Sequence, residues 1–137
     1  ASNVAYVGHV GDSRVYYFRD SAIHQLTEDH SLLNDYLKAK RLTPAEVESF
    51  PHKNVIVRAL GMKDTVQVDV HKFEPKDGDI FLLCSDGLSG MVSDSLLADV
   101  LGKTTLLERA CVQLIDMANA AGGTDNVTCV LARCHAT

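Results

Sequence analysis

The segment 80–87 most constrains what this chain can fold into, because it is an apolar run that ends abruptly in small and charged residues. Five consecutive apolar residues followed by turn-forming ones are typical of a buried strand. This strand would present the Asp86 carboxylate, next to Gly87, at its carboxyl end. Asp12 and Asp125 also stand between small or turn-forming residues and a β-rich run. Three carboxylates at three distant strand ends indicate one shared site.

Length and composition limit the class of protein. The chain has 137 residues, enough for one domain with a hydrophobic core. Its 46% hydrophobic and 23% charged residues are ordinary for a soluble globular protein. The net charge of -5 opposes binding to nucleic acid or to an anionic membrane and favours a cationic ligand. Because no stretch resembles a membrane span or a signal peptide, we expect a cytosolic protein.

The cysteines do not indicate a zinc or redox site. None of them shows the CxxC spacing of such sites, and all four lie in apolar strand or helix patterns: Cys84, Cys111, Cys129 and Cys134. We therefore expect reduced thiols packed in the core.

The hydrophobic periodicity predicts an α+β chain. Three strands at 4–10, 15–18 and 22–26, joined by short turns, would form an antiparallel meander. A helical excursion would follow, with one helix at about 32–40 and a second that begins at Thr43-Pro44. Further strands are predicted at 54–57, 66–70, 80–84 and 127–132, and further helices at 93–101 and 105–121. Helices packed on an antiparallel sheet are the expected architecture.

Five short motifs occur along the chain. They are Val-Gly-Asp-Ser-Arg at 10–14, Leu-Thr-Glu-Asp-His at 26–30, Arg-Ala-Leu-Gly at 58–61, Ser-Asp-Gly-Leu at 85–88 and Gly-Thr-Asp-Asn-Val-Thr at 123–128. In this order they resemble the metal-dependent protein phosphatase family, 2C type, in its bacterial form. The resemblance covers essentially the whole chain, 1–137. It implies two antiparallel sheets packed between helices, an αββα sandwich incomplete at the amino-terminal side, with a flap-like helical insert at about 31–57.

The resemblance also implies metal ligands. Asp86 and Asp125 match ligands of the first metal of the family's binuclear centre, and Asp12 matches a ligand of the third metal of bacterial members, with Asp86 shared. Gly87 and Asn126 would lie beside these ligands. Asn126 would either hold Asp125 in place or start a strand by bonding its own backbone. Ligands with oxygen donors alone select Mg²⁺ or Mn²⁺ over Zn²⁺.

The implied activity is hydrolysis of phosphoserine and phosphothreonine in proteins by a metal-activated water. Phosphorylated proteins would be the substrates, and a cognate Ser/Thr kinase would be a partner. The family's amino-terminal motifs, including the Asp-Gly pair whose carboxylate bridges two metals, have no match here. A second reading therefore stays open, in which the chain is a non-catalytic, truncated module that binds metal or docks to a partner. Missing strands would leave sheet edges through which copies could self-associate.

Other candidate residues have simpler structural interpretations. We expect Arg14 and Arg58 to pair with structural carboxylates instead of binding phosphate. His30 could be a general acid, but a packing or capping role is favoured, and the other histidines show no ligand spacing. The apolar stripe of the last helix is interpreted as core packing, through Leu106, Leu107, Ala110, Leu114 and Met117. The insert at 31–57 would either gate substrates or be a solvated helical hairpin.

Overall fold

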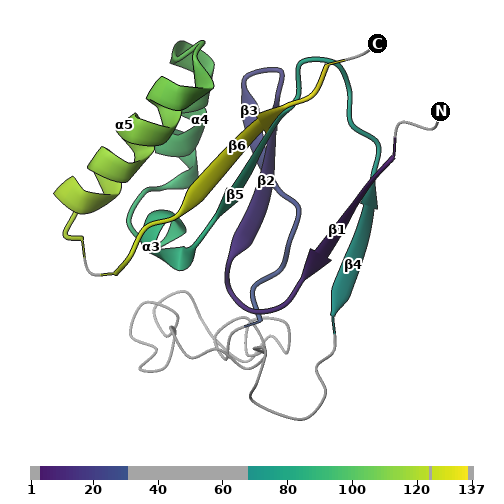
Figure 1. Cartoon of the computed structure of the whole chain (residues 1–137), viewed down its shortest axis with the longest axis horizontal. Helices are drawn as coiled ribbons and strands as arrows, with labels where there is room; N and C mark the ends of the chain where they lie inside the picture. Colours follow the sequence, from purple (N-terminus) through teal and green to yellow (C-terminus); the bar gives the residue numbers. More distant parts are fainter. Residues whose placement is uncertain (1–3, 31–67, 124, 136–137) are drawn as a thin grey trace.

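The computed structural model describes residues 4–30, 68–123 and 125–135. Figure 1 shows their elements in chain order: β1 (Ala5–His9), β2 (Arg14–Arg19), β3 (Ala22–Gln25), β4 (Asp69–Phe73), β5 (Ile80–Cys84), α3 (Asp86–Ser89), α4 (Asp94–Lys103), α5 (Leu107–Ala120) and β6 (Cys129–Arg133). The predicted insert at 31–57, with the strand at 54–57, and Arg58 lie outside the described residues. The short helix α3 was not predicted.

The strands form two antiparallel sheets. One has the order β3-β2-β5-β6, and the other pairs β1 with β4. The predicted meander is therefore wrong for its first strand, because β1 pairs with β4, with His9 opposite Asp69. Only β2 and β3 form a hairpin, through a turn in which Asp20 and Ser21 adopt positive φ. Alternation along one strand predicts which side chains share a face but not which strand lies beside it.

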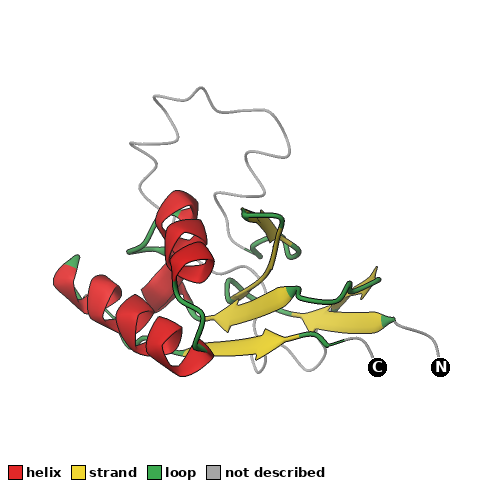
Figure 2. Ribbon diagram, turned by 90° about the horizontal axis from the view of Figure 1, so that it is seen from above, coloured by secondary structure: helices red, strands yellow, loops and turns green. Residues whose placement is uncertain are grey.

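The helices and the smaller sheet lie on opposite faces of the four-stranded sheet (Figures 1 and 2). Phe73 of β4 contacts Tyr17 of β2 and Phe81 of β5, with ring centroids 4.6 and 5.6 Å apart. The neighbouring residues Tyr16 and Leu82 point to the helical side and are fully buried. These layers confirm the predicted α+β class. The described residues supply one helical layer of the expected sandwich.

The core lies between the larger sheet and the helices α4 and α5. The two helices contribute buried residues at helical spacing: Leu97, Val100 and Leu101 from α4, and Ala110, Leu114 and Ala118 from α5. The predicted stripe is correct for Ala110 and Leu114, and Leu107 and Met117 pack partly against this core. Leu106 was wrongly included, because it is the residue before the first turn of α5 and is 56% exposed.

Element boundaries depart from the predictions where tertiary contacts decide them. β4 covers Asp69–Phe73 instead of 66–70, and its Val70 is exposed together with Val68 before it. The packing of Phe73 on the larger sheet turns His71 and Phe73 inward and the valines outward. β6 begins at Cys129 instead of 127, and its Val130 is exposed although a buried strand was expected.

The helix limits are close to the predictions. α4 begins after Ser93, whose hydroxyl accepts a hydrogen bond from the Leu96 amide, and it continues two residues past the predicted end at Leu101. α5 lies inside the predicted range 105–121. No helix in the described part of the chain is long and apolar enough to cross a membrane.

The four cysteines are free thiols, as expected, but the predicted core packing holds in full only for Cys84, because the other three are partly exposed. Cys84 is buried in β5, and burial raises its pKa to about 12. Burial also raises the pKa of Cys129 to about 11, with a smaller effect from the neighbouring Cys111. Raised pKa values keep these thiols protonated and poorly nucleophilic near neutral pH.

Candidate metal centre

Asp12 lies on the short loop between β1 and β2. The loop turns at Gly11, whose φ of 104° favours glycine, and it leads into β2 at Arg14. Asp12 is half-buried at this turn.

Asp86 lies at the same end of the four-stranded sheet. It is the first residue of α3 and follows β5 after Ser85. In the antiparallel pairing of β2 with β5, Arg14 stands opposite Cys84. Asp12 precedes Arg14 by two residues and Asp86 follows Cys84 by two, so both carboxyl groups project at one edge of neighbouring strands. The two side chains are joined by a hydrogen bond.

The contact between these two carboxyl groups is electrostatically unfavourable when both are ionised. Burial raises the pKa of Asp12 above its ordinary value, and the negative charge and hydrogen bond of Asp86 raise it further. A hydrogen bond between two carboxyl groups requires a proton on one of them. A divalent cation would replace that proton and favour ionisation of both groups.

Asp125 lies on the segment that leads into β6, next to β5. Ser85 joins the two segments, because its amide donates to the Thr128 carbonyl at 3.0 Å and its hydroxyl accepts from the Thr128 amide at 3.1 Å. The Asp125 carboxylate is exposed and accepts a hydrogen bond from the Asn126 backbone amide at 2.7 Å. The contact of Asn126 with Asp125 is therefore made by its main chain.

Gly87 permits α3 to approach this segment closely. A Cβ atom at Gly87 would lie 2.0 Å from the carbonyl oxygen of Asn126, which no side chain can occupy. Gly87 thereby brings the backbone that follows Asp86 against the backbone that follows Asp125.

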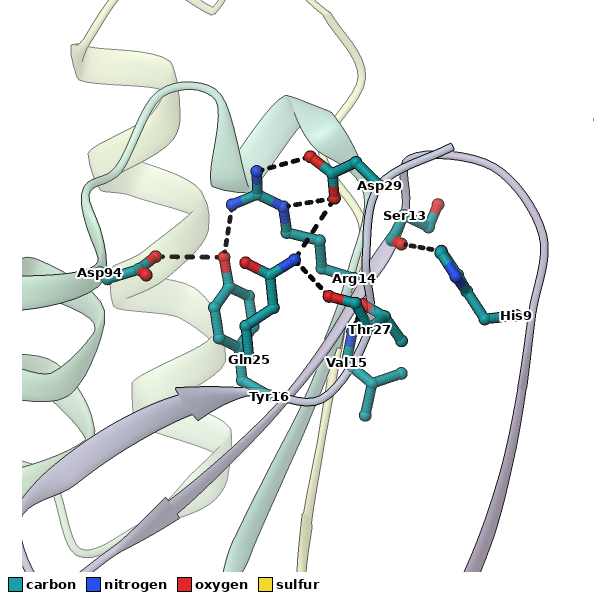
Figure 3. Close-up of polar contacts among 9 residues, drawn as sticks. All are labelled: His9, Ser13, Arg14, Val15, Tyr16, Gln25, Thr27, Asp29 and Asp94. Carbon is teal, nitrogen blue, oxygen red and sulfur yellow. Dashed lines mark hydrogen bonds and ion pairs between the residues drawn. The ribbon is translucent and has the colours of Figure 1, made fainter. Parts of the chain in front are cut away.

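The guanidinium of Arg14 is hydrogen-bonded to neighbouring side chains (Figure 3). Its guanidinium donates to both carboxylate oxygens of Asp29, at 2.9 and 2.7 Å. A third bond reaches the hydroxyl of Tyr16, which in turn donates to Asp94 of α4. The predicted pairing of Arg14 with a structural carboxylate is confirmed. Side-chain bonds to Asp29 and Tyr16, opposed by burial, raise the pKa of Arg14.

A second cluster, not predicted, combines His9, His30 and Asp69. The potential metal-binding atoms of these three side chains lie within 4.8 Å of one another. Asp12, Asp86 and Asp125 are also described by the structure, but their carboxylate oxygens do not all come this close together. His30 is buried and bonded through both ring nitrogens, as a packing role requires. The sequence held no signal for this cluster, because it depends on the pairing of β1 with β4.

A pocket of about 470 Å³ opens beside the same sheet end. It is lined by the loop before β2 and by the facing ends of β5 and β6, among them Ser13, Arg14, Ser85 and Thr128. Asp12 and Asp86 are not among the lining residues, although each is the chain neighbour of one of them, Ser13 or Ser85.

Comparison with known proteins gives this arrangement a family. The model of the protein phosphatase 2C family matches residues 1–127. Protein phosphatase PhpP of Streptococcus pneumoniae is 44% identical over 129 residues, which cover 94% of this chain and 52% of PhpP. The chain thus spans about half the length of the curated relatives it matches.

Solved structures agree. The serine/threonine phosphatase of S. agalactiae has a TM-score of 0.90 at 38% identity, over 96% of this chain and 54% of the other. The catalytic domain of the serine/threonine protein phosphatase PstP, in complex with 2 manganese ions, has a TM-score of 0.82 at 37% identity, over 97% of this chain and 54% of the other. This chain belongs to the protein phosphatase 2C family.

Proposed function

We propose that this chain carries part of the metal centre of a serine/threonine protein phosphatase, with Asp12, Asp86 and Asp125 as carboxylate ligands. The carrying observation is the hydrogen-bonded contact of Asp12 with Asp86 at one sheet end. Among the residues that the structure describes, the main groups that shift the pKa of Asp12 include no basic side chain, and two carboxyl groups held together in this way are suited to a shared cation.

The donor chemistry fits Mg²⁺ or Mn²⁺. All three side chains offer oxygen atoms, which hard divalent ions prefer. The manganese-bound PstP structure supports the same choice for this chain. When bound, such ions neutralise charge on a phosphoryl group and lower the pKa of a coordinated water.

The chain's own residues would orient these ligands. The Asn126 amide holds one oxygen of Asp125 at 2.7 Å, and the close approach at Gly87 fixes the spacing of the two segments. The Arg14–Asp29 pair anchors the start of β2 immediately after Asp12. A fixed set of ligands lowers the cost of organising the site when the ion binds.

Phosphoserine and phosphothreonine in proteins are the proposed substrates of the whole enzyme, and a cognate Ser/Thr kinase is a proposed partner. Both proposals are based on family membership. They concern the whole enzyme, because this chain spans only about half the length of its relatives. The cytosolic location stays a prediction.

The first experiment is a titration of the 137-residue chain with Mn²⁺, in which the electron paramagnetic resonance signal of free Mn²⁺ is measured after each addition. We expect saturable binding that Asp86→Asn abolishes and that Asp99→Asn preserves, because Asp99 is an exposed residue of α4 paired with Lys103. Binding that is equal in both variants would contradict the proposed site.

Hydrolysis of a small aryl phosphate by the same three proteins then separates the two functions. Mn²⁺-dependent turnover that is lost only in Asp86→Asn would support catalysis by this chain. Binding without turnover would favour the non-catalytic module.

Self-association through sheet edges is also proposed. In the described residues, β3 and β6 are the outer strands of the larger sheet, and β1 and β4 have one pairing each. Unpaired strand edges can pair with another copy. Sedimentation velocity over a range of concentrations tests this, and a concentration-independent monomer would contradict it.

A further inference from the structure

The cluster of His9, His30 and Asp69 lies beside the loop that carries Asp12, and its chemistry can be assigned. Two imidazoles and a carboxylate are the donor set of many zinc and iron sites. The ligand atoms lie within 4.8 Å of one another, as such a site needs. The hydrogen bonds of His30 distinguish a metal site from a chain of hydrogen bonds that runs from Asp69 through the His30 ring to Gly11. We call this chain the relay.

Both ring nitrogens of His30 are in use. Its Nδ1 atom accepts a hydrogen bond from the Gly11 amide at 2.9 Å, so Nδ1 carries a lone pair and no proton. Its Nε2 atom lies 2.6 Å from Oδ2 of Asp69, so the ring proton is on Nε2 and is donated to the carboxylate. A metal at Nε2 would force the proton onto Nδ1, opposite the Gly11 N–H. The observed bonds therefore fit a relay and not a metal ligand.

The relay ends on the backbone next to Asp12. Gly11 donates its N–H to the His30 ring, and its carbonyl oxygen accepts a hydrogen bond from the His30 amide at 2.8 Å. His30 therefore holds both backbone polar groups of Gly11. On the other side of the loop, Nε2 of His9 donates to the Ser13 carbonyl at 2.8 Å (Figure 3). Asp12 lies between these two attachment points.

Burial makes the His30 contact strong. His30 is 3% exposed and Gly11 is buried, so a Gly11 N–H without its acceptor could not be satisfied by water. His9 is also buried, and desolvation lowers its pKa, so the charged form of His9 is disfavoured.

We propose that His30, oriented by Asp69, is a positioning residue that holds the Gly11–Asp12 loop so that Asp12 faces Asp86. The proposal rests on the proposed role of Asp12 as a metal ligand. It gives Asp69 of the smaller sheet a connection to the metal centre at the end of the larger sheet.

Two substitutions of His30 separate its two bonds. Asparagine places an amide oxygen near the position of Nδ1 and can accept from Gly11, but it is too short to reach Asp69. Glutamine places its amide near Nε2 and can donate to Asp69, but it offers Gly11 no acceptor. We expect His30→Gln to weaken Mn²⁺ binding about tenfold or more, as loss of a group that orients a metal ligand does, and His30→Asn to weaken it about threefold or less.

A control and an independent measurement complete the test. His24→Gln, an exposed histidine of β3, should leave Mn²⁺ affinity unchanged. In metal-free protein, the Gly11 amide should exchange with solvent about tenfold faster in His30→Gln than in the wild type or His30→Asn. If the wild type binds no Mn²⁺, the proposed function fails, while the exchange rates still decide the relay.

Three results would overturn the relay. One is equal Gly11 protection in the wild type and in His30→Gln. Another is a proton on Nδ1 of His30 in the wild-type ¹⁵N spectrum, which needs no variant and no assumption about folding. The third is stoichiometric Zn²⁺ binding that disappears in both His9→Gln and Asp69→Asn, because it would show that the cluster is a metal site.

Discussion

Asp12 is placed where its charge is unfavourable to the fold. Because burial and Asp86 raise its pKa, the folded chain binds this proton more tightly than the unfolded chain does. The free energy of unfolding therefore falls as the pH rises from 3.8, the pKa of Asp12 in the unfolded chain, through the higher pKa of Asp12 in the folded chain. A residue that destabilises the metal-free fold is typical of a binding site.

Asp12→Asn should therefore separate stability from binding. We expect the metal-free variant to be more stable near neutral pH, by less than about 1 kcal/mol because a half-exposed carboxylate is screened by water. Its Mn²⁺ affinity should fall. Thermal unfolding with and without Mn²⁺ measures both effects, and Asp20→Asn in the exposed β2–β3 turn is the control. A less stable metal-free variant would contradict this account.

Gly87 is the residue at which one methyl group should matter most. Gly87→Ala would place Cβ 2.0 Å from the Asn126 carbonyl oxygen, so backbone must shift. We expect a loss of about 1–3 kcal/mol in the free energy of unfolding, with weaker Mn²⁺ binding. In Gly102→Ala the new Cβ would meet Phe18 at an ordinary 3.5 Å, and a helical alanine should stabilise α4 by up to about 1 kcal/mol. Urea unfolding of both variants tests the contrast.

At the scale of elements, α5 illustrates how one helix face supports the sheet. Leu114 is fully buried against the core, while Val112, two residues earlier, is 60% exposed. Leu114→Ala should cost about 2–5 kcal/mol, because it leaves a cavity, and Val112→Ala should change stability by no more than about 0.5 kcal/mol. Equal effects in chemical denaturation would show that α5 does not pack as described.

At the scale of the whole molecule, Arg19 links the two sheets. Its guanidinium lies 5.1 Å from the Tyr17 ring centroid in β2 and 5.4 Å from that of Phe73 in β4, and it pairs with the buried Asp79 before β5. The bond from Arg19 is the main cause that holds the pKa of Asp79 below its ordinary value. The pair therefore stabilises the fold at a pH above 3.8, the pKa of Asp79 in the unfolded chain. This contribution is lost as the pH falls through the lower pKa of Asp79 in the folded chain.

Asp79→Asn should lose about 2 kcal/mol of stability near neutral pH, where the charged bond is present. The difference in stability between the variant and the wild type should become smaller as the pH falls below 3.8, the pKa of Asp79 in the unfolded chain. Melting temperatures across an acid-to-neutral series test this. Asp116→Asn, a change of the same charge on the exposed face of α5, should leave the profile unchanged. A constant difference at all pH values would contradict the pKa argument.

Apart from the short helix α3 and the shifted limits of β4 and β6, the sequence alone predicted which of the described segments are strands and helices. It also predicted where Asp12, Asp86 and Asp125 stand relative to them. Those features depend on neighbours in the chain: an apolar run for β5, a capping serine before α4, turn residues beside each aspartate. The five motifs were sufficient to indicate the family that the comparisons confirm.

Only the tertiary structure decided that β1 pairs with β4, that Val70 faces outward, and that His9, His30 and Asp69 meet beside Asp12. These outcomes depend on contacts between residues far apart in the chain, and alternation within a strand carries no information about its partner. The hydrogen bonds that select the His30 tautomer depend on the same long-range pairing. For this reason the sequence predicted the candidate ligands with Gly87 and Asn126 beside them, whereas the contacts of His30 with Asp69 and Gly11 were found only in the fold.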